Sequence, residues 1–225
     1  MKWRSVRHNF ASAIFTLLLS LSGCAGIGGF GVDAAGMTQE EVERLPMEGQ
    51  FDLLGERYQA MQELMTHAQR MVSPKIWTWT SHGFYPGSGD AQRWSMRGAT
   101  PKNSYYLSMS RTIQLPGASG AVEDAELMAE YFEAQGWSTT LGQVDARRYR
   151  VEAMTDEGFW FEYQVRPHGQ YSLGLHSKVF WCDRDALSSA VIDRIPEERF
   201  GIEESPPGEY IPFPKWSDPV VPKTG

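Results

Sequence analysis

The sequence contains only two cysteines, Cys24 and Cys182, among its 225 residues. This number excludes the dense disulfide framework that holds many small secreted domains together. If Cys24 is modified, Cys182 has no partner within the chain, and we expect it to be a reduced, buried thiol near the end of a strand. Pairing with another chain is the alternative. The chain is nevertheless long enough to be stabilised by a hydrophobic core.

The apolar run from Phe10 to Leu21 is too short for a comfortable transmembrane helix, which needs about 20 residues. Three basic residues (Lys2, Arg4 and Arg7) precede it, and small residues follow it. A positive start, an apolar middle and a small-residue end are typical of a signal peptide. We therefore predict a leader over residues 1–23. An ordinary secreted leader with a chance cysteine and an uncleaved anchor helix are the alternatives.

The end of this leader, Leu21-Ser22-Gly23-Cys24, resembles the lipobox of bacterial lipoproteins. The resemblance implies that the Cys24 thiol receives a diacylglyceryl group and that the leader is cut before this residue. The lipid on Cys24 would then hold the protein on the extracytoplasmic face of the cell membrane. Two or three acyl chains satisfy the rule that stable anchoring takes more than one lipid signal.

Basic residues are also few compared with acidic ones. Without residues 1–23, 18 basic residues face 28 acidic ones, which gives the mature chain a net charge of −10. Such a surface repels nucleic acid and anionic lipid headgroups, so we expect no nucleic-acid partner.

No strong catalytic, metal or cofactor motif is present. The chain has no Gly-x-Ser-x-Gly elbow and no dinucleotide-binding motif. The histidines after the leader lack the close Cys, His or carboxylate neighbours that zinc requires. His176-Ser177 and Asp183 make a poor triad, because adjacent strand residues point to opposite faces. We therefore expect no metal, no cofactor and no catalytic residue, with a small envelope hydrolase as the alternative.

The remaining sequence predicts one α+β domain. A glycine-rich tether is expected over 24–37, the domain over 38–200, and an extended, proline-rich tail, dispensable for folding, over 201–225. Thr38 and Glu41 form a capping-box pair at the start of a short helix that we expect to run to Leu45. The next helix has one apolar face with helical spacing, made of Phe51, Leu54, Tyr58, Met61, Met65, Ala68 and Val72.

A second main helix is expected over 121–135, ending at Gly136, and Asp183 is expected to cap a short helix. The predicted strands are 76–80, 94–96, 104–115 and a four-strand meander near 137–143, 147–155, 159–166 and 170–181. Both main helices would pack on one face of the antiparallel sheet. In strand 104–115 the expected inward residues are Tyr105, Leu107, Met109, Ile113 and Leu115.

Two turns of the meander predict its register. Residues 156–158 and 167–169 are three-residue loops ending in glycine, which suits a type I turn followed by a left-handed residue. Phe161 should then face Ala153 and Leu175. The same register sets Glu152 against Glu162, and like charges directly opposite are unfavourable. A shift by two residues, which relieves this repulsion, is the alternative.

This order of elements resembles the small LppA-like lipoproteins of high-GC Gram-positive bacteria. The resemblance covers the lipobox and roughly residues 50–182, with Gly136-Trp137 after the second main helix as a local signature. It implies an α+β envelope domain of unassigned activity.

The polar face of the meander is the candidate binding face. The register places Trp160 opposite His176, with Arg150, Glu162 and Arg166 around them. A large aromatic residue on a wet face gains from being covered, so we expect an exposed contact surface for an envelope protein, a glycan or a lipid. Simple solvent exposure of the face is the alternative.

The resulting hypothesis is a lipid-anchored, non-catalytic binding protein. An immunity or accessory lipoprotein for a secreted toxin or complex is a further alternative.

Overall fold

The computed structural model describes residues 31–93 and 95–221, so the leader and Cys24 lie outside the described part. In chain order the helices and strands are α1 (Gln39–Glu43), α2 (Met47–Val72), β1 (Trp77–Ser81), β2 (Gly87–Ser88), the 3-10 turn η1 (Gly89–Ala91), β3 (Ser104–Tyr106), β4 (Ser108–Gln114), α3 (Val122–Ala134), β5 (Ser138–Asp145), β6 (Arg148–Met154), β7 (Phe159–Arg166), η2 (Pro167–Gly169), β8 (Gln170–Ser177), β9 (Phe180–Trp181), α4 (Arg184–Ile192), η3 (Glu197–Gly201) and β10 (Glu204–Ser205).

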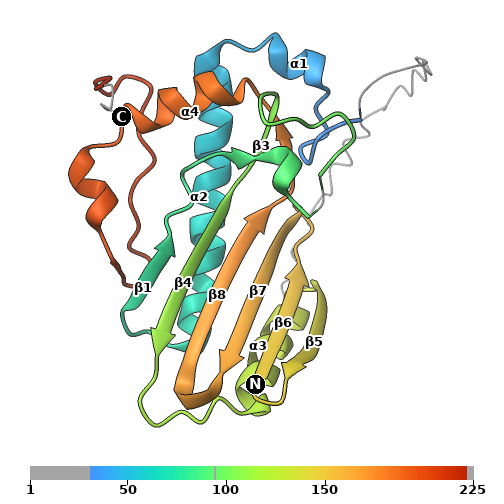
Figure 1. The fold of residues 1–225 in the computed structure, drawn as a ribbon, viewed down its shortest axis with the longest axis vertical. Helices are drawn as coiled ribbons and strands as arrows, with labels where there is room; N and C mark the ends of the chain where they lie inside the picture. Colours follow the sequence, from blue (N-terminus) through green and yellow to red (C-terminus); the bar gives the residue numbers. More distant parts are fainter. Residues whose placement is uncertain (1–30, 94, 222–225) are drawn as a thin grey trace, which may run out of the picture.

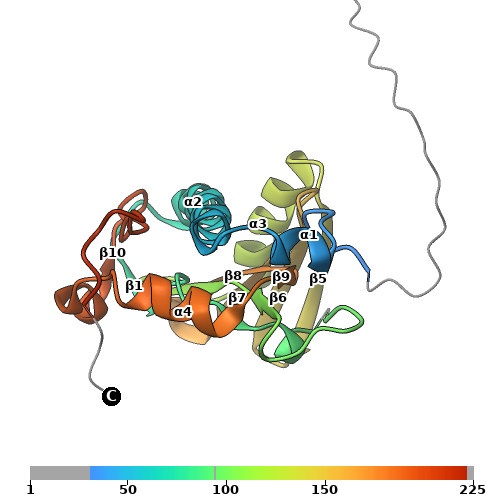
Figure 2. The same ribbon diagram turned by 90° about the horizontal axis from the view of Figure 1, so that it is seen from above.

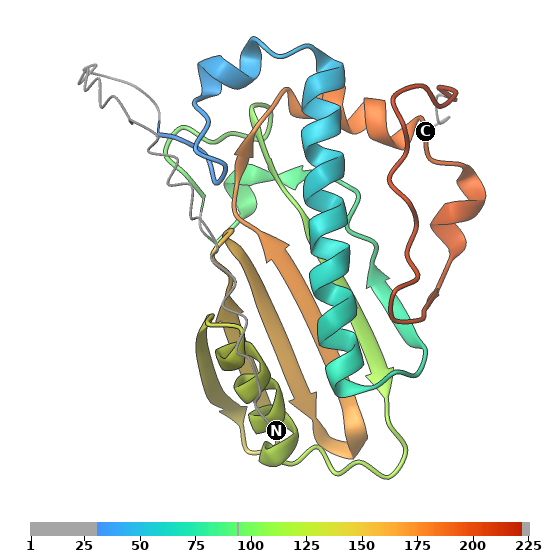
Figure 3. The same ribbon diagram turned by 180° about the vertical axis from the view of Figure 1, so that it is seen from behind.

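One antiparallel sheet forms the body of the domain, with the strand order β10-β1-β4-β8-β7-β6-β5. Helices α2 and α3 both lie on one face of this sheet (Figures 2 and 3). A small sheet, β2-β3-β9, and helix α4 lie at one end (Figure 1). The predicted α+β class, with two main helices on one face of an antiparallel sheet, is confirmed.

The helix signals are largely confirmed. Thr38 and Glu41 form the capping box, although α1 ends at Glu43, before the expected Leu45. The predicted apolar face of α2 is buried through Ala68, and Val72 at the end of the helix is half-buried. Asp183 caps α4 by accepting a hydrogen bond from the Ala186 N–H.

The end of α3 joins the helix to the sheet. Gly136 has a φ of +81°, and the Trp137 N–H donates to the Phe132 carbonyl, as expected of a glycine that ends a helix. The rings of Phe132 and Trp137 both stack on Phe161 of β7, with centroids 4.8 and 5.5 Å away. This aromatic cluster fixes α3 over the half of the sheet that ends at β5.

The glycine-led register of the meander is confirmed, since Phe161 pairs with both Ala153 and Leu175. Glu152 does lie opposite Glu162, and the Arg150 guanidinium, 3.8 and 3.7 Å from the two carboxylates, offsets their repulsion. The second turn differs in detail, because both His168 (φ +65°) and Gly169 (φ +72°) are left-handed.

Three strand predictions are wrong. Ser95 and Met96 are in no strand, and the chain pairs at Gly87–Ser88 instead. The expected strand 104–115 is broken at Leu107, whose N–H donates to the Ser177 hydroxyl, so β3 and β4 belong to different sheets. The last meander strand ends at Ser177, and the chain changes to the small sheet as β9.

The first and last described segments of the chain pack more closely than expected. The described end of the tether lies against β9, because the buried Asp33 carboxylate accepts the Trp181 N–H and the Gly31 carbonyl accepts the Trp181 indole N–H, each at 3.2 Å. At the other end, Glu204 and Ser205 pair with β1. The segment predicted to be an extended tail therefore includes a short strand that is hydrogen-bonded to the sheet.

We call residues 203–221 the C-terminal strap. Its aromatic residues pack on α2, with the Phe213 ring centroid 5.0 Å from Phe51 and 5.6 Å from Tyr58. The Tyr58 hydroxyl donates to the Ile211 carbonyl at 2.6 Å, and Ile211 is 4% exposed. The strap is therefore part of the hydrophobic core.

Candidate functional site

Trp160 and His176, the centre of the predicted binding face, lie on the side of the sheet opposite α2 and α3, near the start of β7. The rings of Trp160 and His176 stack with centroids 4.4 Å apart. Trp160 is only 8% exposed, so the expectation of an exposed aromatic is wrong. Met154 and His176 flank it on the neighbouring strands, and the segment around η1 crosses this end of the outer face (Figure 2). Gln92 of that segment donates to the Ser177 carbonyl at 3.0 Å.

The charged residues of the predicted face form a continuous ladder across two strands. Arg166 donates to Gln164 at 3.0 Å, and Gln164 donates to Glu162. Arg150 lies between Glu162 and Glu152, and Arg93 contacts Glu152 at 3.3 Å. The structure thus brings together Arg150, Glu162 and Arg166, as predicted from the register. Whether this face binds a partner remains a prediction.

Among the described residues of this face, Ser108 and His176 form a contact that resembles part of a catalytic triad. Ser108 Oγ lies 2.9 Å from His176 Nδ1. Burial lowers the pKa of His176, and the nearby Glu162 raises it in part. Among the described residues, no carboxylate is hydrogen-bonded to the ring, which a triad requires. The pair therefore explains the orientation of His176 without indicating a hydrolase.

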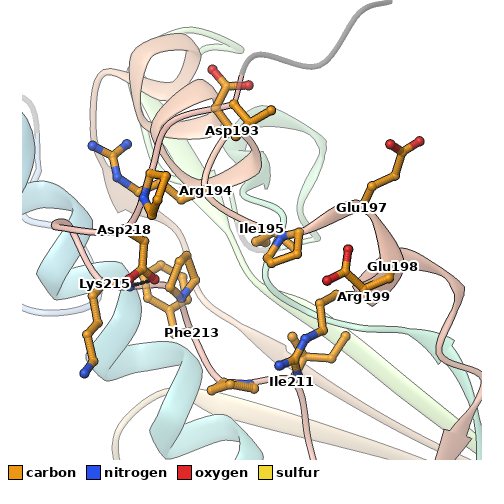
Figure 4. Close-up of a pocket in the computed structure, with 15 residues that line it drawn as sticks. Asp193, Arg194, Ile195, Glu197, Glu198, Arg199, Ile211, Phe213, Lys215 and Asp218 are labelled. Atoms are coloured by element: carbon orange, nitrogen blue, oxygen red, sulfur yellow. Dashed lines mark hydrogen bonds between the residues drawn. The ribbon is translucent and has the colours of Figure 1, made fainter.

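A pocket that the sequence did not predict lies between the end of α4, η3 and the C-terminal strap (Figure 4). Its volume is about 670 Å³, in the range of small-molecule sites. Apolar lining comes from Ile195, Ile211 and Phe213, of which Ile195 and Ile211 are almost fully buried. Charged side chains of both signs line it as well, namely Asp193, Arg194, Glu197, Glu198, Arg199, Lys215 and Asp218.

Hydrogen bonds between distant segments join the two sides of this strap pocket. The Val221 N–H donates to the Asp193 carbonyl at 2.7 Å, and Arg194 Nε donates to the Trp216 carbonyl at 3.0 Å. The Arg194 guanidinium also lies 4.2 Å from the Trp216 ring centroid. The only hint of this pocket in the sequence is the alternation of apolar residues and prolines over 211–214. Such a pattern does not show which surface of the domain the segment packs against.

A buried arginine is the second feature that the sequence missed. Arg111 is 1% exposed and lies on the helix-facing side of β4, between Met109 and Ile113. Its guanidinium donates to Ser205 Oγ at 2.8 Å, to Gln62 Oε1 at 2.9 Å and to the Ser81 carbonyl at 3.2 Å. No ion pair to Arg111 occurs among the described residues.

The Arg111 guanidinium stacks on the Trp79 ring, and burial lowers the pKa of this group. Its donors join β4 to α2, β1 and β10. We assign it a structural role at the covered edge of the sheet.

Cys182 is 6% exposed and free, and burial raises the pKa of its thiol, as expected for the buried cysteine. In the part of the chain that the structure describes, no group of His, Cys, Asp and Glu side chains could hold a metal ion. None of the described helices is long and apolar enough to cross a membrane.

Comparisons with known proteins give little support for an identity. No family model matches the sequence, and no curated protein matches it. Among solved structures, the chain is similar to LppA, a predicted lipoprotein of Mycobacterium tuberculosis, with a TM-score of 0.35 and 17% identity over 64% of this chain and 92% of that chain. A similarity of this size carries no inference about family or activity.

Proposed function

We propose that this chain is a lipoprotein of the cell envelope, anchored on the extracytoplasmic face through Cys24, whose domain binds a ligand or partner without catalysis. The observation that carries the proposal is the sequence Leu21-Ser22-Gly23-Cys24 at the end of a signal-like leader.

The described domain fits such an anchor. The Gly31 carbonyl already binds the Trp181 indole, so only six residues, or seven Cα–Cα steps, separate Cys24 from Gly31. A chain of that length spans at most about 25 Å. A lipid on Cys24 would therefore hold the domain close to the membrane surface.

The test of the anchor is metabolic labelling with a fatty-acid probe. We expect label on the wild type and on Cys182→Ser, which keeps the lipobox, and none on Cys24→Ser. Mass spectrometry should show that the labelled protein begins at Cys24. Equal labelling of Cys24→Ser would contradict the proposal.

The strap pocket is the best-formed candidate for the ligand site. Its buried apolar floor and its charged lining of both signs suit a molecule with an apolar body and a polar end. Binding would remove the remaining apolar surface of the floor from water, which stabilises a complex by about 25 cal/mol per Å².

An amphiphilic dye, 1-anilinonaphthalene-8-sulfonate, can probe this pocket. Val221 lines it and is 58% exposed, so Val221→Trp should narrow the pocket without disturbing the core. Val144→Trp is the matched control, since Val144 is 43% exposed and lies on β5. We expect saturable binding that only Val221→Trp weakens. Binding that both variants leave unchanged would exclude the pocket as the dye site.

A further inference from the structure

We propose that β5 is a docking edge for an extended, basic segment of a partner protein, which adds to the seven-stranded sheet as an eighth strand. This interaction surface is separate from the strap pocket and does not depend on it. The proposal rests on the open backbone of β5 and on the charge of the helix beside it.

The backbone of β5 is available for pairing. β5 is the last strand of the sheet, and β6 is the only strand of the described chain that pairs with it. It has eight residues, seven of which are exposed. Alternate residues of an edge strand point their N–H and C=O groups away from the sheet, where another strand can bind them.

β5 has few of the features that usually prevent an edge strand from pairing with another chain. The strand Ser-Thr-Thr-Leu-Gly-Gln-Val-Asp contains no proline and no lysine, and its register shift comes only near the end, between Gln143 and Asp145. Nothing lies within 4 Å of where a Cβ on Gly142 would be, so no described residue covers the strand at this position on the side where the Cβ would point. Strands of this length and exposure are templates for strand addition.

The charge of α3 indicates which partner fits. Thr139 and Leu141 pair with the core residues Ala153 and Val151, so they lie on the α3 side of the sheet. The buried face of α3 contains Ala125, Met128, Ala129 and Phe132.

At 100° per residue, the exposed Glu126 and Glu133 lie on one flank of this buried face, and Asp124 lies on the other. Asp124 accepts a hydrogen bond from Tyr171 of β8, which assigns its flank to the α2 side. Glu126 and Glu133 therefore lie on the β5 side, and Figures 2 and 3 show α3 between α2 and β5.

In an eighth strand paired with β5, every second side chain would point to the α3 side of the sheet, towards Glu126 and Glu133. Lys or Arg at those positions would be attracted, and acidic residues would be repelled. A second copy of this chain is disfavoured as the occupant, because two-fold pairing of β5 would bring the two acidic α3 flanks towards each other. The alternation of basic side chains on one face is thus the expected signature of the partner segment.

The probe is a fluorescein-labelled, eight-residue peptide with Lys and Thr in alternation, measured by fluorescence anisotropy with the full chain in detergent. We expect saturable binding that Glu126→Lys with Glu133→Lys weakens at least tenfold. The matched control is Asp52→Lys with Glu56→Lys, which changes the same charge on the exposed face of α2 and should leave binding within twofold.

Two N-methylated peptides separate strand addition from simple charge attraction. N-methyl groups on alternate residues block one edge of the peptide, so one version should lose binding at least tenfold while the other version retains it. Equal binding of both versions, or of a Glu-Thr peptide, would overturn the proposal. So would absence of binding, or self-association of the chain that Glu126→Lys with Glu133→Lys strengthens.

Discussion

The two edges of the seven-stranded sheet end in opposite ways. At one edge the two-residue strand β10, which is part of the strap, pairs with β1, and the rest of the strap packs on α2 (Figure 2). At the other edge β5 is eight residues long and largely exposed. The chain thus covers one edge with the strap and leaves the second without cover from any described segment.

This difference assigns stability to the covered edge and association with a partner to the open edge. The covered edge contains a buried arginine, a buried strap residue and aromatic contacts, so substitutions there should lower the free energy of unfolding. The open edge contributes little buried side-chain area, so substitutions there should change association and leave stability almost unchanged.

The largest effect is expected from removing the strap. A chain ending at Ile202 loses the burial of Ile211 and the packing of Phe213 and Trp216 against Phe51. We expect loss of cooperative unfolding, or a fall in unfolding free energy of more than about 4 kcal/mol, the typical cost of deleting one large core side chain. A chain ending at Val221 is the control for chemical denaturation. An unchanged midpoint for the shorter chain would show that the strap is dispensable.

Arg111→Lys should have the next largest effect. Lysine keeps the charge but cannot reproduce the planar fork that bonds Ser205, Gln62 and the Ser81 carbonyl together. Losing these charge-assisted bonds should lower the unfolding free energy by about 3 kcal/mol. Arg150→Lys, at a half-exposed position on the outer face, should change it by less than about 0.5 kcal/mol. Equal losses of unfolding free energy for the two substitutions would show that the buried Arg111 is no more important for stability than the half-exposed Arg150.

Gly55→Val should disturb the seat of the strap on α2. A Cβ at Gly55 would lie 2.8 Å from the Phe213 ring, so the ring must move. We expect a loss of about 2 kcal/mol, as for other overpacked sites. In a Phe213→Ala background the same substitution should cost clearly less, and a double-mutant cycle by denaturation measures this coupling. Additive costs would show that the clash with Phe213 is not the cause.

The smallest effect concerns pH. Burial lowers the pKa of both His82 and His176 below the ordinary 6.5, and the Arg111 charge lowers that of His82 further. The unfolded chain therefore binds more protons, so this part of the stability is complete above pH 6.5 and is lost as the pH falls towards the folded pKa values. His82→Gln and His176→Gln should each flatten the dependence of unfolding free energy on pH. Imidazole pKa values of 6.5 or above by NMR would contradict this.

The sequence predicted what local rules determine. The register of the meander followed from glycine turns and apolar alternation, which both select the pairing of Phe161 with Ala153 and Leu175. The α2 face followed from helical spacing.

The remaining features depend on long-range contacts that no local pattern contains. Arg111 fits the alternation of β4, but its burial needs Gln62 and Ser205 from distant segments. Trp160 was expected to be exposed, because the sequence pattern does not show that the η1 segment crosses this end of the outer face. The strap pocket arises only once residues 211–221 lie beside Asp193.

The contrast between the edges is tested most directly by native-state hydrogen exchange of the full chain, resolved by residue. We expect slow exchange throughout β1, including Trp79, whose N–H donates to the Glu203 carbonyl at 2.7 Å. In β5 we expect an alternation, with slow exchange where the N–H pairs with β6 and fast exchange where it points outward. Uniformly slow exchange along β5, as slow as in β1, would show that this edge is covered and would contradict the account.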